Sequence, residues 1–285
     1  MTVGGGSSDQ AGARALAAGV AEQVPALLAA VRSRRPLVHI FANFVTMQDV
    51  ARATRAVGAL PVMALAGPDA EEIAEQADAL VLSLGTPTAD RLDAMHAAGR
   101  RAAARAVPIV LDPVGAGATT FRTTAARGLL AHLPVAVIRA NRGEAAALLG
   151  QAGRVRGVES VAPEPNAAAT LASRLAAAYG GVAAVTGPSD AVADPKRAVI
   201  IEHGHPWLAA VSGAGCMVTA LVGAFCAVGG DRLAAAAAAL VCFGVAAEIA
   251  ARRAAGPGTL VPALLDALYH LDVERTRHPL RVKEP

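Results

Sequence analysis

The sequence predicts an α/β fold in three layers, with a mainly parallel central sheet, helices on both of its faces and a late antiparallel hairpin. Two observations support this prediction. Short apolar runs alternate with helical stretches through the first two thirds of the chain, and such alternation favours parallel strands. Two strand-like runs then follow each other around a short turn, and hairpin strands pair antiparallel.

The expected strands are short and nearly free of charge, as in a sheet that is covered on both faces. They lie at Leu37–Phe41, Leu60–Ala64, Ala79–Leu84, Val107–Leu111, Val135–Ile138 and Gly181–Val185. Helical patterns between them indicate helices at Met47–Val57, 88–106, 123–132 and 166–179. The hairpin is expected from Ala198–Glu202 and Trp207–Val211, with His203 and His205 as exposed turn residues. Helices at 214–228, 231–254 and 259–271 close the domain.

The chain shows no linker, no change of composition and no internal repeat, so we expect a single domain. Its bounds are expected at residues 14–273, between a flexible, Gly/Ser-rich N-terminal tail at 1–13 and a C-terminal tail at 274–285. The apolar run Ala15–Val20 is interrupted by Glu22 and Gln23 and lacks a strongly cationic segment before it. We therefore expect no targeting segment.

Composition narrows the function classes. Hydrophobic residues make up 54% of the chain and charged residues 17%, which excludes disorder for most of it. A net charge of +3 and 3% aromatic residues argue against nucleic-acid binding, which needs a basic face and usually stacking rings. The three cysteines lack metal-ligand spacing, so a reducing cytoplasm is expected. The apolar stretches 214–230 and 233–250 are dominated by alanine, so buried helices are expected rather than membrane spans.

The small-residue turn at Gly213, Ala214, Gly215 and Cys216 is the central functional candidate. It precedes a long apolar helix, whose first N–H groups have no partner within the helix. Together with the helix dipole, these groups favour phosphate or a developing negative charge, and small residues let a ligand approach the backbone. Taken alone, the turn also suits an ordinary strand-to-helix connection.

Polar residues follow neighbouring strands, where open α/β sheets bind ligands. They are Asp112, Asn141, Glu144, Thr186 and Gly187. Acidic side chains beside an anion hole suit magnesium-dependent phosphoryl transfer, because carboxylates hold the hydrated cation. Asp112 and Glu144 are the expected metal ligands. Each also has an ordinary interpretation, Asp112 as a turn residue before Pro113 and Glu144 as a charge at a helix N-terminus.

The sequence resembles hydroxyethylthiazole kinase, a thiamine-salvage enzyme of the ribokinase-like superfamily, over roughly residues 36–270. The run from Asp112 to Thr119 (DPVGAGAT) and the Gly213–Cys216 turn carry most of the resemblance. Further matches are Pro36–His39 with Asn43, Ala59–Ala64, Leu84–Thr86, Ile138–Asn141 with Glu144, Val185–Gly187 and Gly223–Val228. The resemblance implies a ribokinase-like αβα sandwich and a homotrimer with active sites at subunit interfaces.

The same resemblance implies transfer of the γ-phosphoryl group of ATP to the primary alcohol of 4-methyl-5-(2-hydroxyethyl)thiazole. ATP contacts fall on Arg139 and Thr186, with Asn141 and Gly187 on the same strand ends. Thiazole contacts fall on Met63 and Gly213, and Asn43 is expected in the same pocket. Mg²⁺ is the implied cofactor.

Cys216 has two interpretations. A helix N-terminus can lower a thiol pKa, so a role as general base is possible; a small apolar residue at the helix start is the alternative. The chain also departs from the resembled family at three positions, with Ala42 for threonine, Ser212 for threonine and Ala140 for glycine. The loss of the threonine hydroxyl at Ala42 bears on substrate preference.

Three other functions remain open at this stage. A hydroxymethylpyrimidine kinase or an ADP-dependent hydrate dehydratase would share the nucleotide site. Cys216 argues against the dehydratase, whose relatives carry aspartate there, and the Asp112–Thr119 run argues against the pyrimidine kinase. A non-catalytic thiazole or nucleotide sensor would bind ligand without turnover, and Asp112 with Glu144 argues against it.

Overall fold

The computed structural model describes residues 6–151, 155–156, 159–160, 167–272 and 280–285. Its central sheet has the strand order β11-β10-β9-β8-β5-β4-β3-β1-β2. The neighbours β2, β1, β3, β4, β5 and β8 pair in parallel. The neighbours β8, β9, β10 and β11 pair antiparallel. The predicted mainly parallel sheet with a late antiparallel part is therefore confirmed.

The elements have the following bounds. The strands of the sheet are β1 Leu37–Phe41, β2 Leu60–Val62, β3 Ala79–Ser83, β4 Ile109–Asp112, β5 Val135–Asn141, β8 Val182–Thr186, β9 Asp190–Ala193, β10 Ala198–Ile201 and β11 Val282–Lys283. The helices are α1 Gly6–Arg34, α2 Met47–Val57, α3 Gly67–Ala74, α4 Ala89–Ala104, α5 Thr120–His132, α6 Arg142–Leu148, α7 Ala167–Tyr179, α8 Ala214–Val228, α9 Arg232–Ala251 and α10 Pro257–Tyr269. A 3₁₀ helix, η1, spans Pro206–Ala210, and the short strands β6 Val155–Arg156 and β7 Glu159–Ser160 form a separate pair.

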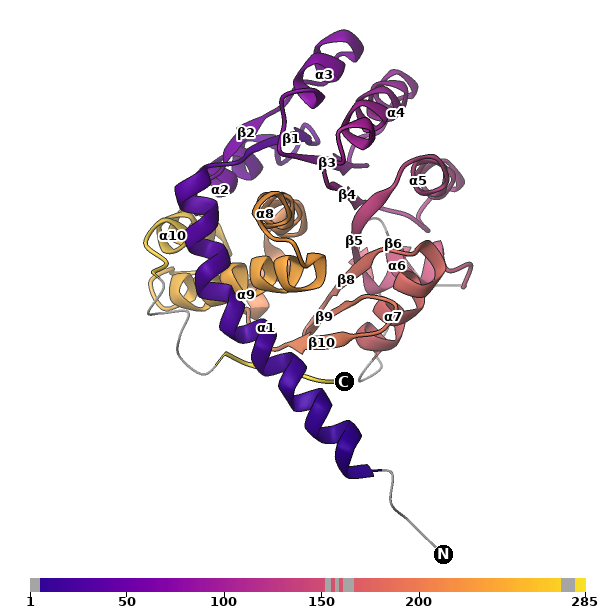
Figure 1. Ribbon diagram of the computed structural model, residues 1–285. Coiled ribbons are helices and arrows are strands. Elements are labelled where there is room, and N and C mark those ends of the chain that lie inside the picture. The colour runs from indigo at the N-terminus through magenta and orange to yellow at the C-terminus, as the bar shows by residue number, and fades with distance from the viewer. Residues whose placement is uncertain (1–5, 152–154, 157–158, 161–166, 273–279) are drawn as a thin grey trace, which may run out of the picture.

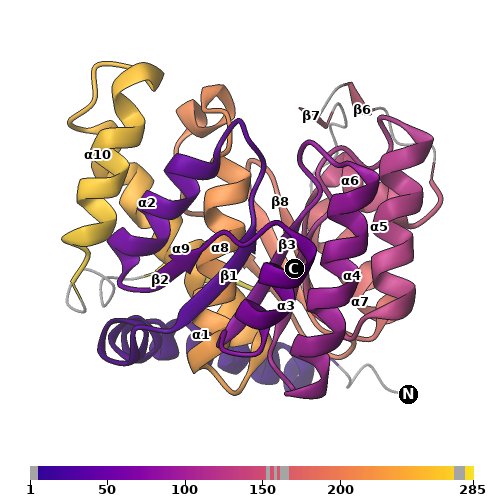
Figure 2. The same ribbon diagram turned by 90° about the horizontal axis from the view of Figure 1, so that it is seen from above.

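Alternate residues along each strand point to opposite faces and build two cores. Val81 and Val137 belong to the core shared with α1, α2, α8, α9 and α10, whereas Leu82 and Ile138 belong to the core shared with α3 to α7. In Figure 1 the sheet curves around α8, and Figure 2 shows the two groups of helices from above. These two layers of helices with the sheet between them confirm the predicted αβα arrangement.

Two of the described helices, α1 and α9, contain segments long and apolar enough to cross a membrane by length and composition. Within the fold, the segment Arg232–Ala251 of α9 is 89% buried, and Gly223 of α8 packs against Val81 of the sheet. The segment Ala15–Arg34 of α1 is 28% buried. Alanine-rich α8 and α9 thus serve as core helices, as predicted.

The predicted hairpin is wrong by one element. Residues 207–211 do not form a strand, because Pro206 begins the 3₁₀ helix η1. The antiparallel partner of β10 is β9, joined to it by the turn around Asp194, whose carboxylate accepts from the N–H groups of Lys196 and Arg197. His203 is also not exposed, since its side chain is only 5% accessible.

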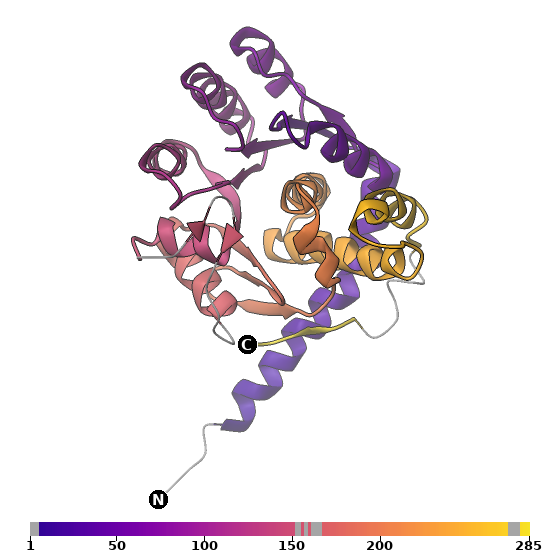
Figure 3. The same ribbon diagram turned by 180° about the vertical axis from the view of Figure 1, so that it is seen from behind.

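Both expected tails contain structure. Helix α1 begins at Gly6, inside the segment that was expected to be loose, and residues 1–5 lie outside the described residues. The C-terminal segment forms β11, which pairs with Ile200 and Ile201 at the edge of the sheet. Figure 3 shows this strand beside α1, seen from behind. The parallel half of the sheet follows the sequence prediction, whereas the antiparallel edge contains elements that it missed.

Candidate active site

The predicted site residues gather at the carboxyl ends of neighbouring strands, beside the N-terminus of α8. Asn43 follows β1, Asp112 ends β4, Asn141 ends β5 and Thr186 ends β8. In the sheet Ser83 of β3 pairs with Asp112, and Asn141 pairs with Thr186. Their side chains therefore share the edge where open α/β sheets place ligands.

Neighbouring side chains lie very close to the backbone of the glycine turn. Gly213 has φ +86°, a left-handed conformation that suits glycine, and a Cβ added there would meet Thr46 Cγ2 at 2.4 Å. A Cβ at Gly215 would meet the Arg139 guanidinium, 2.4 Å from Nη1. Gly213 thus requires glycine, whereas a side chain at position 215 would displace the Arg139 guanidinium, which lies directly over the start of α8. The first N–H groups of this helix face the same edge of the sheet and could hold a phosphate.

Asn43 connects the loop after β1 to Cys216. Its Nδ2 donates to Thr46 Oγ1 at 2.8 Å and lies 3.5 Å from Cys216 Sγ, while its Oδ1 accepts from the N–H groups of Val45 and Thr46. Ser83 Oγ is 3.9 Å from the same sulfur. The side chain of Asn43 therefore shapes the loop as well as facing the site.

Cys216 is half-buried, and the environment of its thiol favours the neutral form. Burial raises the pKa of the thiol to about 12, and the neighbouring Asp112 acts in the same direction, while Arg139 opposes both. Of the two interpretations of Cys216, this pKa favours the small packing residue over a thiolate base at neutral pH, because desolvation disfavours the charged form.

Asp112 is fully buried and incompletely paired. Its Oδ2 accepts from Thr219 Oγ1 at 3.1 Å, whereas Oδ1 lies 3.6 Å from Arg139 Nη1 and has no hydrogen-bond partner. Burial raises the pKa of Asp112, and Arg139 and Thr219 counteract only part of that shift. This carboxylate oxygen can accept a cation or a proton donor from a ligand.

Glu144 forms a capping box with Asn141 at the start of α6. Its Oε2 accepts from the Asn141 N–H at 2.9 Å, and its Oε1 accepts from the Gly115 N–H at 2.8 Å. Burial and the charge of Asp112 raise its pKa to about 7. Glu144 thereby ties the loop after β4 to the helix after β5, a structural role that its sequence position alone does not reveal.

Burial raises the pKa values of both carboxylates, and the charge of Asp112 raises that of Glu144 further, so a bound cation fits here and would relieve the repulsion. Within the described residues, no group of three or more His, Cys, Asp or Glu side chains forms a complete metal site. Magnesium needs no such cage, since it is usually held by one or two carboxylates, water and substrate phosphates. Asp112, whose Oδ1 accepts no hydrogen bond, fits direct contact; Glu144, with two N–H donors already bound, fits contact through water.

The expected nucleotide residues also come together. Arg139 Nη2 donates to Thr186 Oγ1, which joins the ends of β5 and β8. The Gly187 N–H donates to Asp190 Oδ1 at 2.9 Å, and a Cβ at Gly187 would lie 3.0 Å from Arg142 Nε. Arg139 therefore spans the distance from the glycine turn to Thr186, as expected of a residue that contacts phosphates.

Met63 follows β2 and is partly buried against the core beneath α8. The next carbonyl, that of Ala64, is bonded to the buried His39 Nε2 at 2.8 Å. The contact with Cys216 places Asn43 at the glycine turn, whereas no hydrogen bond or ion pair among the described residues joins Met63 to that turn. Its role in thiazole binding stays a prediction.

Four positioning residues were missed by sequence reasoning. Thr46 packs on Gly213, Ser83 faces Cys216, Thr219 bonds Asp112, and Arg91 Nη2 donates to the Ala42 carbonyl at 2.8 Å. Thr219 could have been found, because it lies one helical turn after Gly215, on the same face of α8. The others depend on contacts between segments that are far apart in the sequence.

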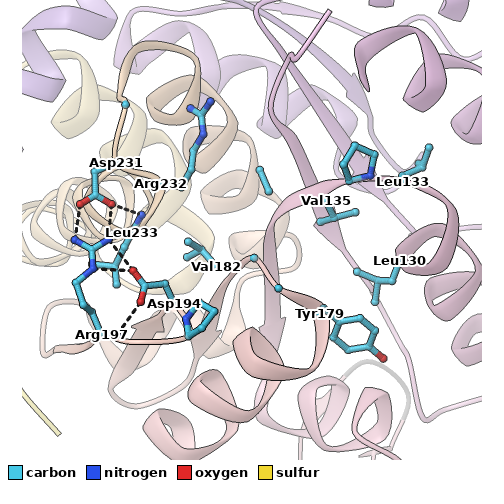
Figure 4. A pocket seen from close by; sticks show the side chains of 16 residues that line it. Leu130, Leu133, Val135, Tyr179, Val182, Asp194, Arg197, Asp231, Arg232 and Leu233 are labelled. Atoms are coloured by element: carbon cyan, nitrogen blue, oxygen red, sulfur yellow. Dashed lines mark hydrogen bonds and ion pairs between the residues drawn. The ribbon is translucent and has the colours of Figure 1, made fainter. Parts of the chain in front are cut away.

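A cavity of about 660 Å³ lies at the other end of the sheet. Figure 4 shows its lining, which comes from the amino ends of β5 and β8 and from the turns around Asp194 and Asp231. Arg197 donates to both aspartates, at 2.7 Å to Asp194 and at 2.7 and 3.0 Å to Asp231. The charged groups of Arg197, Asp194 and Asp231 in this cavity are thus paired with one another, and none of the predicted site residues lines the cavity.

Sequence and structure comparisons place the chain among known proteins. The hydroxyethylthiazole kinase family profile matches residues 28–274. The chain belongs to the hydroxyethylthiazole kinase family. It is 50% identical to a hydroxyethylthiazole kinase of Desulforudis audaxviator, over 90% of this chain and 93% of that one. A second such kinase, from Chloroflexus aurantiacus, is 48% identical over 92% of this chain and 97% of its own.

Solved structures agree with the family. The hydroxyethylthiazole kinase protein of Pyrococcus horikoshii superposes with a TM-score of 0.85 at 41% identity, covering 93% of this chain and 99% of its own. Bacillus subtilis pyridoxal kinase, solved as an ADP complex, gives a TM-score of 0.58 at 18% identity over 75% of this chain and 91% of its own. At that identity the second match shows the fold alone. The predicted ribokinase-like fold is thus confirmed.

Proposed function

We propose that this protein transfers the γ-phosphoryl group of ATP to the primary alcohol of 4-methyl-5-(2-hydroxyethyl)thiazole, a step in thiamine salvage. The observation that carries this proposal is the convergence at the start of α8. There Asn43, Arg139 and Thr46 contact the glycine turn or its cysteine, and Asp112 contacts the first turn of the helix through Thr219. Membership of the family supports the choice of acceptor.

The chain's own groups have distinct roles in this reaction. Arg139 and Thr186, with Asn141 and Gly187 beside them, bind the ATP phosphates at the ends of β5 and β8. The N–H groups at Gly215 and Cys216 stabilise the charge that develops on the transferred group, since they are fixed before the reaction begins. Asn43, Met63 and Gly213 orient the thiazole alcohol.

The fit of the two carboxylates supports Mg²⁺, held by Asp112 and, through water, by Glu144. When bound, magnesium neutralises phosphate charge. The protonated Cys216 thiol does not act as a base, and a loose phosphoryl-transfer transition state requires little help from one. Cys216 instead fills the space between Asn43 and Ser83 at the helix start.

We further propose a cytoplasmic homotrimer with the active sites at subunit interfaces. Phe44 and Val45, 68% and 74% exposed, follow Asn43 directly and support an apolar contact beside the site. Light scattering after size-exclusion chromatography tests this assembly, and a monodisperse monomer at working concentrations contradicts it.

The deciding experiment measures ADP formation by the purified protein with ATP and Mg²⁺, with and without the thiazole alcohol. Mass spectrometry of the product should identify the phosphorylated thiazole. Hydroxymethylpyrimidine and a hydrate of NADH serve as competing substrates. Turnover of either competitor without turnover of the thiazole overturns the proposal. Thiazole binding without any product instead indicates a sensor.

A further inference from the structure

A carboxylate far along the chain from the glycine turn holds the segment that leads into it. Glu248, on α9, accepts three hydrogen bonds through Oε1. The donors are the Gly204 N–H at 2.9 Å, His203 Nδ1 at 3.2 Å and the Arg281 guanidinium. Burial raises the pKa of Glu248, but these donors outweigh it and keep the pKa below its usual value. We call this group, Glu248 with His203, Gly204 and Arg281, the Glu248 brace.

His203 is fixed on both sides of its ring. The Arg281 N–H donates to Nε2 at 2.9 Å, so Nε2 must be the acceptor, and the proton of the neutral ring is on Nδ1, facing Glu248. Helix α9 passes close by, since a Cβ at Gly244 would lie 2.6 Å from His203 Cβ. The position of His203 is therefore determined by α9 and by the C-terminal segment together.

The brace is connected to the catalytic turn by consecutive short-range bonds. The Trp207 and Leu208 N–H groups bond to Nδ1 and O of His205, at 3.3 and 3.0 Å. The Val211 N–H then donates to the Leu208 carbonyl at 3.2 Å, and the Ala214 N–H donates to Val211 at 3.3 Å. Residues 205–213, which we call the connector, thus form a series of tight turns from the brace to Gly213.

The C-terminal segment bonds to the brace, just before the connector. Strand β11 has two residues at the sheet edge, where Val282 is partly exposed and Lys283 exposed. Arg281 makes the inward bonds, with Nε donating to the Glu202 carbonyl at 2.7 Å. By contrast, the Lys283–Glu202 ion pair is exposed on both sides and should be worth little.

We propose that Glu248 and Arg281 are positioning residues for phosphoryl transfer, which hold the connector and hence the Gly213–Cys216 turn in its reactive place. This inference rests on the proposed function for its kinetic consequence. The C-terminal segment, expected from the sequence to be a tail, is then required for efficient turnover while folding depends on it little. A turn displaced by a fraction of an ångström binds nucleotide but stabilises the transition state poorly.

The test compares Arg281→Ala with the matched control Lys283→Ala in the full-length protein, since both remove one cation from the same strand region. For Arg281→Ala we expect kcat to fall about 3- to 10-fold, because misplacement of reacting groups acts on the chemical step. The KM for ATP should change less than about twofold, because the contacts that bind ATP lie away from the connector and should be equally strong in the ground state and in the transition state. Lys283→Ala should change neither, and Arg281→Lys should recover most of the lost rate.

Hydrogen exchange of the amides at 204–214 gives a readout that needs no substrate. Arg281→Ala should speed exchange there and leave the parallel strands unchanged. Unchanged local exchange, faster exchange spread over the sheet, or a loosened connector with wild-type kcat each overturns the proposal. Should the wild-type protein form no thiazole phosphate, the proposed function fails, and the exchange comparison still decides whether the brace holds the connector.

Discussion

The two ends of the sheet hold similar charged residues in opposite electrostatic states. At the carboxyl end, Asp112 Oδ1 and Arg139 Nε are buried without hydrogen-bond partners, and the pKa values of Asp112 and Glu144 are raised by burial. At the amino end, hydrogen bonds from Arg197 hold the pKa of Asp231 below its usual value, and backbone and Arg197 bonds overcome burial at Asp194. The cavity of about 660 Å³ lies at the amino end.

This contrast shows that a cavity by itself does not mark the site in this fold. A buried charged group with an unfilled hydrogen-bonding position costs stability, so it persists where a ligand completes it. The amino-end cavity has an internally satisfied network that stabilises the turns around Asp194 and Asp231. The carboxyl end, where Asp112 Oδ1 and Arg139 Nε lack hydrogen-bond partners, has the chemistry for a charged ligand.

The strongest test of the contrast is Asp112→Asn. Loss of the proposed magnesium ligand should lower kcat on the order of 10²- to 10³-fold, as removal of a preorganised charge does elsewhere. The midpoint of thermal unfolding should stay level or rise, because a buried, incompletely paired charge is removed. Steady-state kinetics and thermal unfolding of the same preparations measure both.

The matched control is Asp231→Ala at the amino end. Asp231 caps α9 and pairs with Arg197, so the free energy of unfolding should fall by about 1 kcal/mol, the usual cost of a lost N-cap. Its kcat and KM values should equal those of the wild type. Equal activity losses in the two variants would mean that the two ends of the sheet do not differ in function.

Gly213→Ala should have the next largest effect. The left-handed φ of +86° costs an L-residue about 1–2 kcal/mol, and the added Cβ would also contact Thr46 at 2.4 Å. The resulting shift of the turn should reduce kcat about tenfold or more. Gly128→Ala on α5, where an added Cβ meets nothing within 4 Å, is the control and should keep full activity. Wild-type kcat in Gly213→Ala would contradict a catalytic role for this turn.

The sequence predicted the parallel part of the sheet well because apolar strand runs and helix signals agree there. β1 and α2 have their predicted bounds, and Gly58 ends α2 in the left-handed conformation expected after a helix. The prediction failed around Trp207. The apolar residues there suit a strand, but they form a 3₁₀ helix that begins at Pro206. Local propensity could not indicate that β9 would supply the missing partner of β10.

The sequence predicted which residues of the candidate site lie close together, but not their protonation states. Position at strand ends placed Asp112, Asn141 and Thr186 together, since parallel strands end at one edge. Burial decides the rest: it determines the protonation of Cys216 and leaves one oxygen of Asp112 unpaired. Contacts such as Thr46 on Gly213 join segments far apart in the sequence, and no spacing rule reveals them.

In magnesium-free protein, the contributions of Asp112 and Asp231 to the free energy of unfolding should change with pH in opposite directions. The raised pKa of Asp112 means that the folded state takes up its proton more readily, so its stability contribution is present below the unfolded value of 3.8 and is lost as pH rises through the folded pKa. The lowered pKa of Asp231 means the reverse: its contribution is present above 3.8 and is lost as pH falls through the folded pKa.

Urea denaturation between pH 3 and pH 7.5 measures this difference. The stability of the wild type relative to Asp112→Asn should decrease as pH rises, and the stability relative to Asp231→Asn should increase. Asp231→Asn suits this comparison because the amide preserves the shape of the side chain. Slopes of the same sign for both pairs would show that the two ends are electrostatically alike.

The smallest effect is expected for Cys216→Ala. With a pKa of about 12, the thiol is protonated at neutral pH, and its sulfur contacts Asn43 and Ser83 without carrying charge. Removing it should lower kcat less than about tenfold, whereas loss of a general base costs 10²- to 10⁴-fold. The pH–rate profiles of the variant and the wild type should have the same shape between pH 7 and pH 9. A larger loss, together with loss of a rise in rate with pH that the wild type shows, would restore Cys216 as the base and would mean that Mg²⁺ or ATP reverses the effect of burial on the thiol.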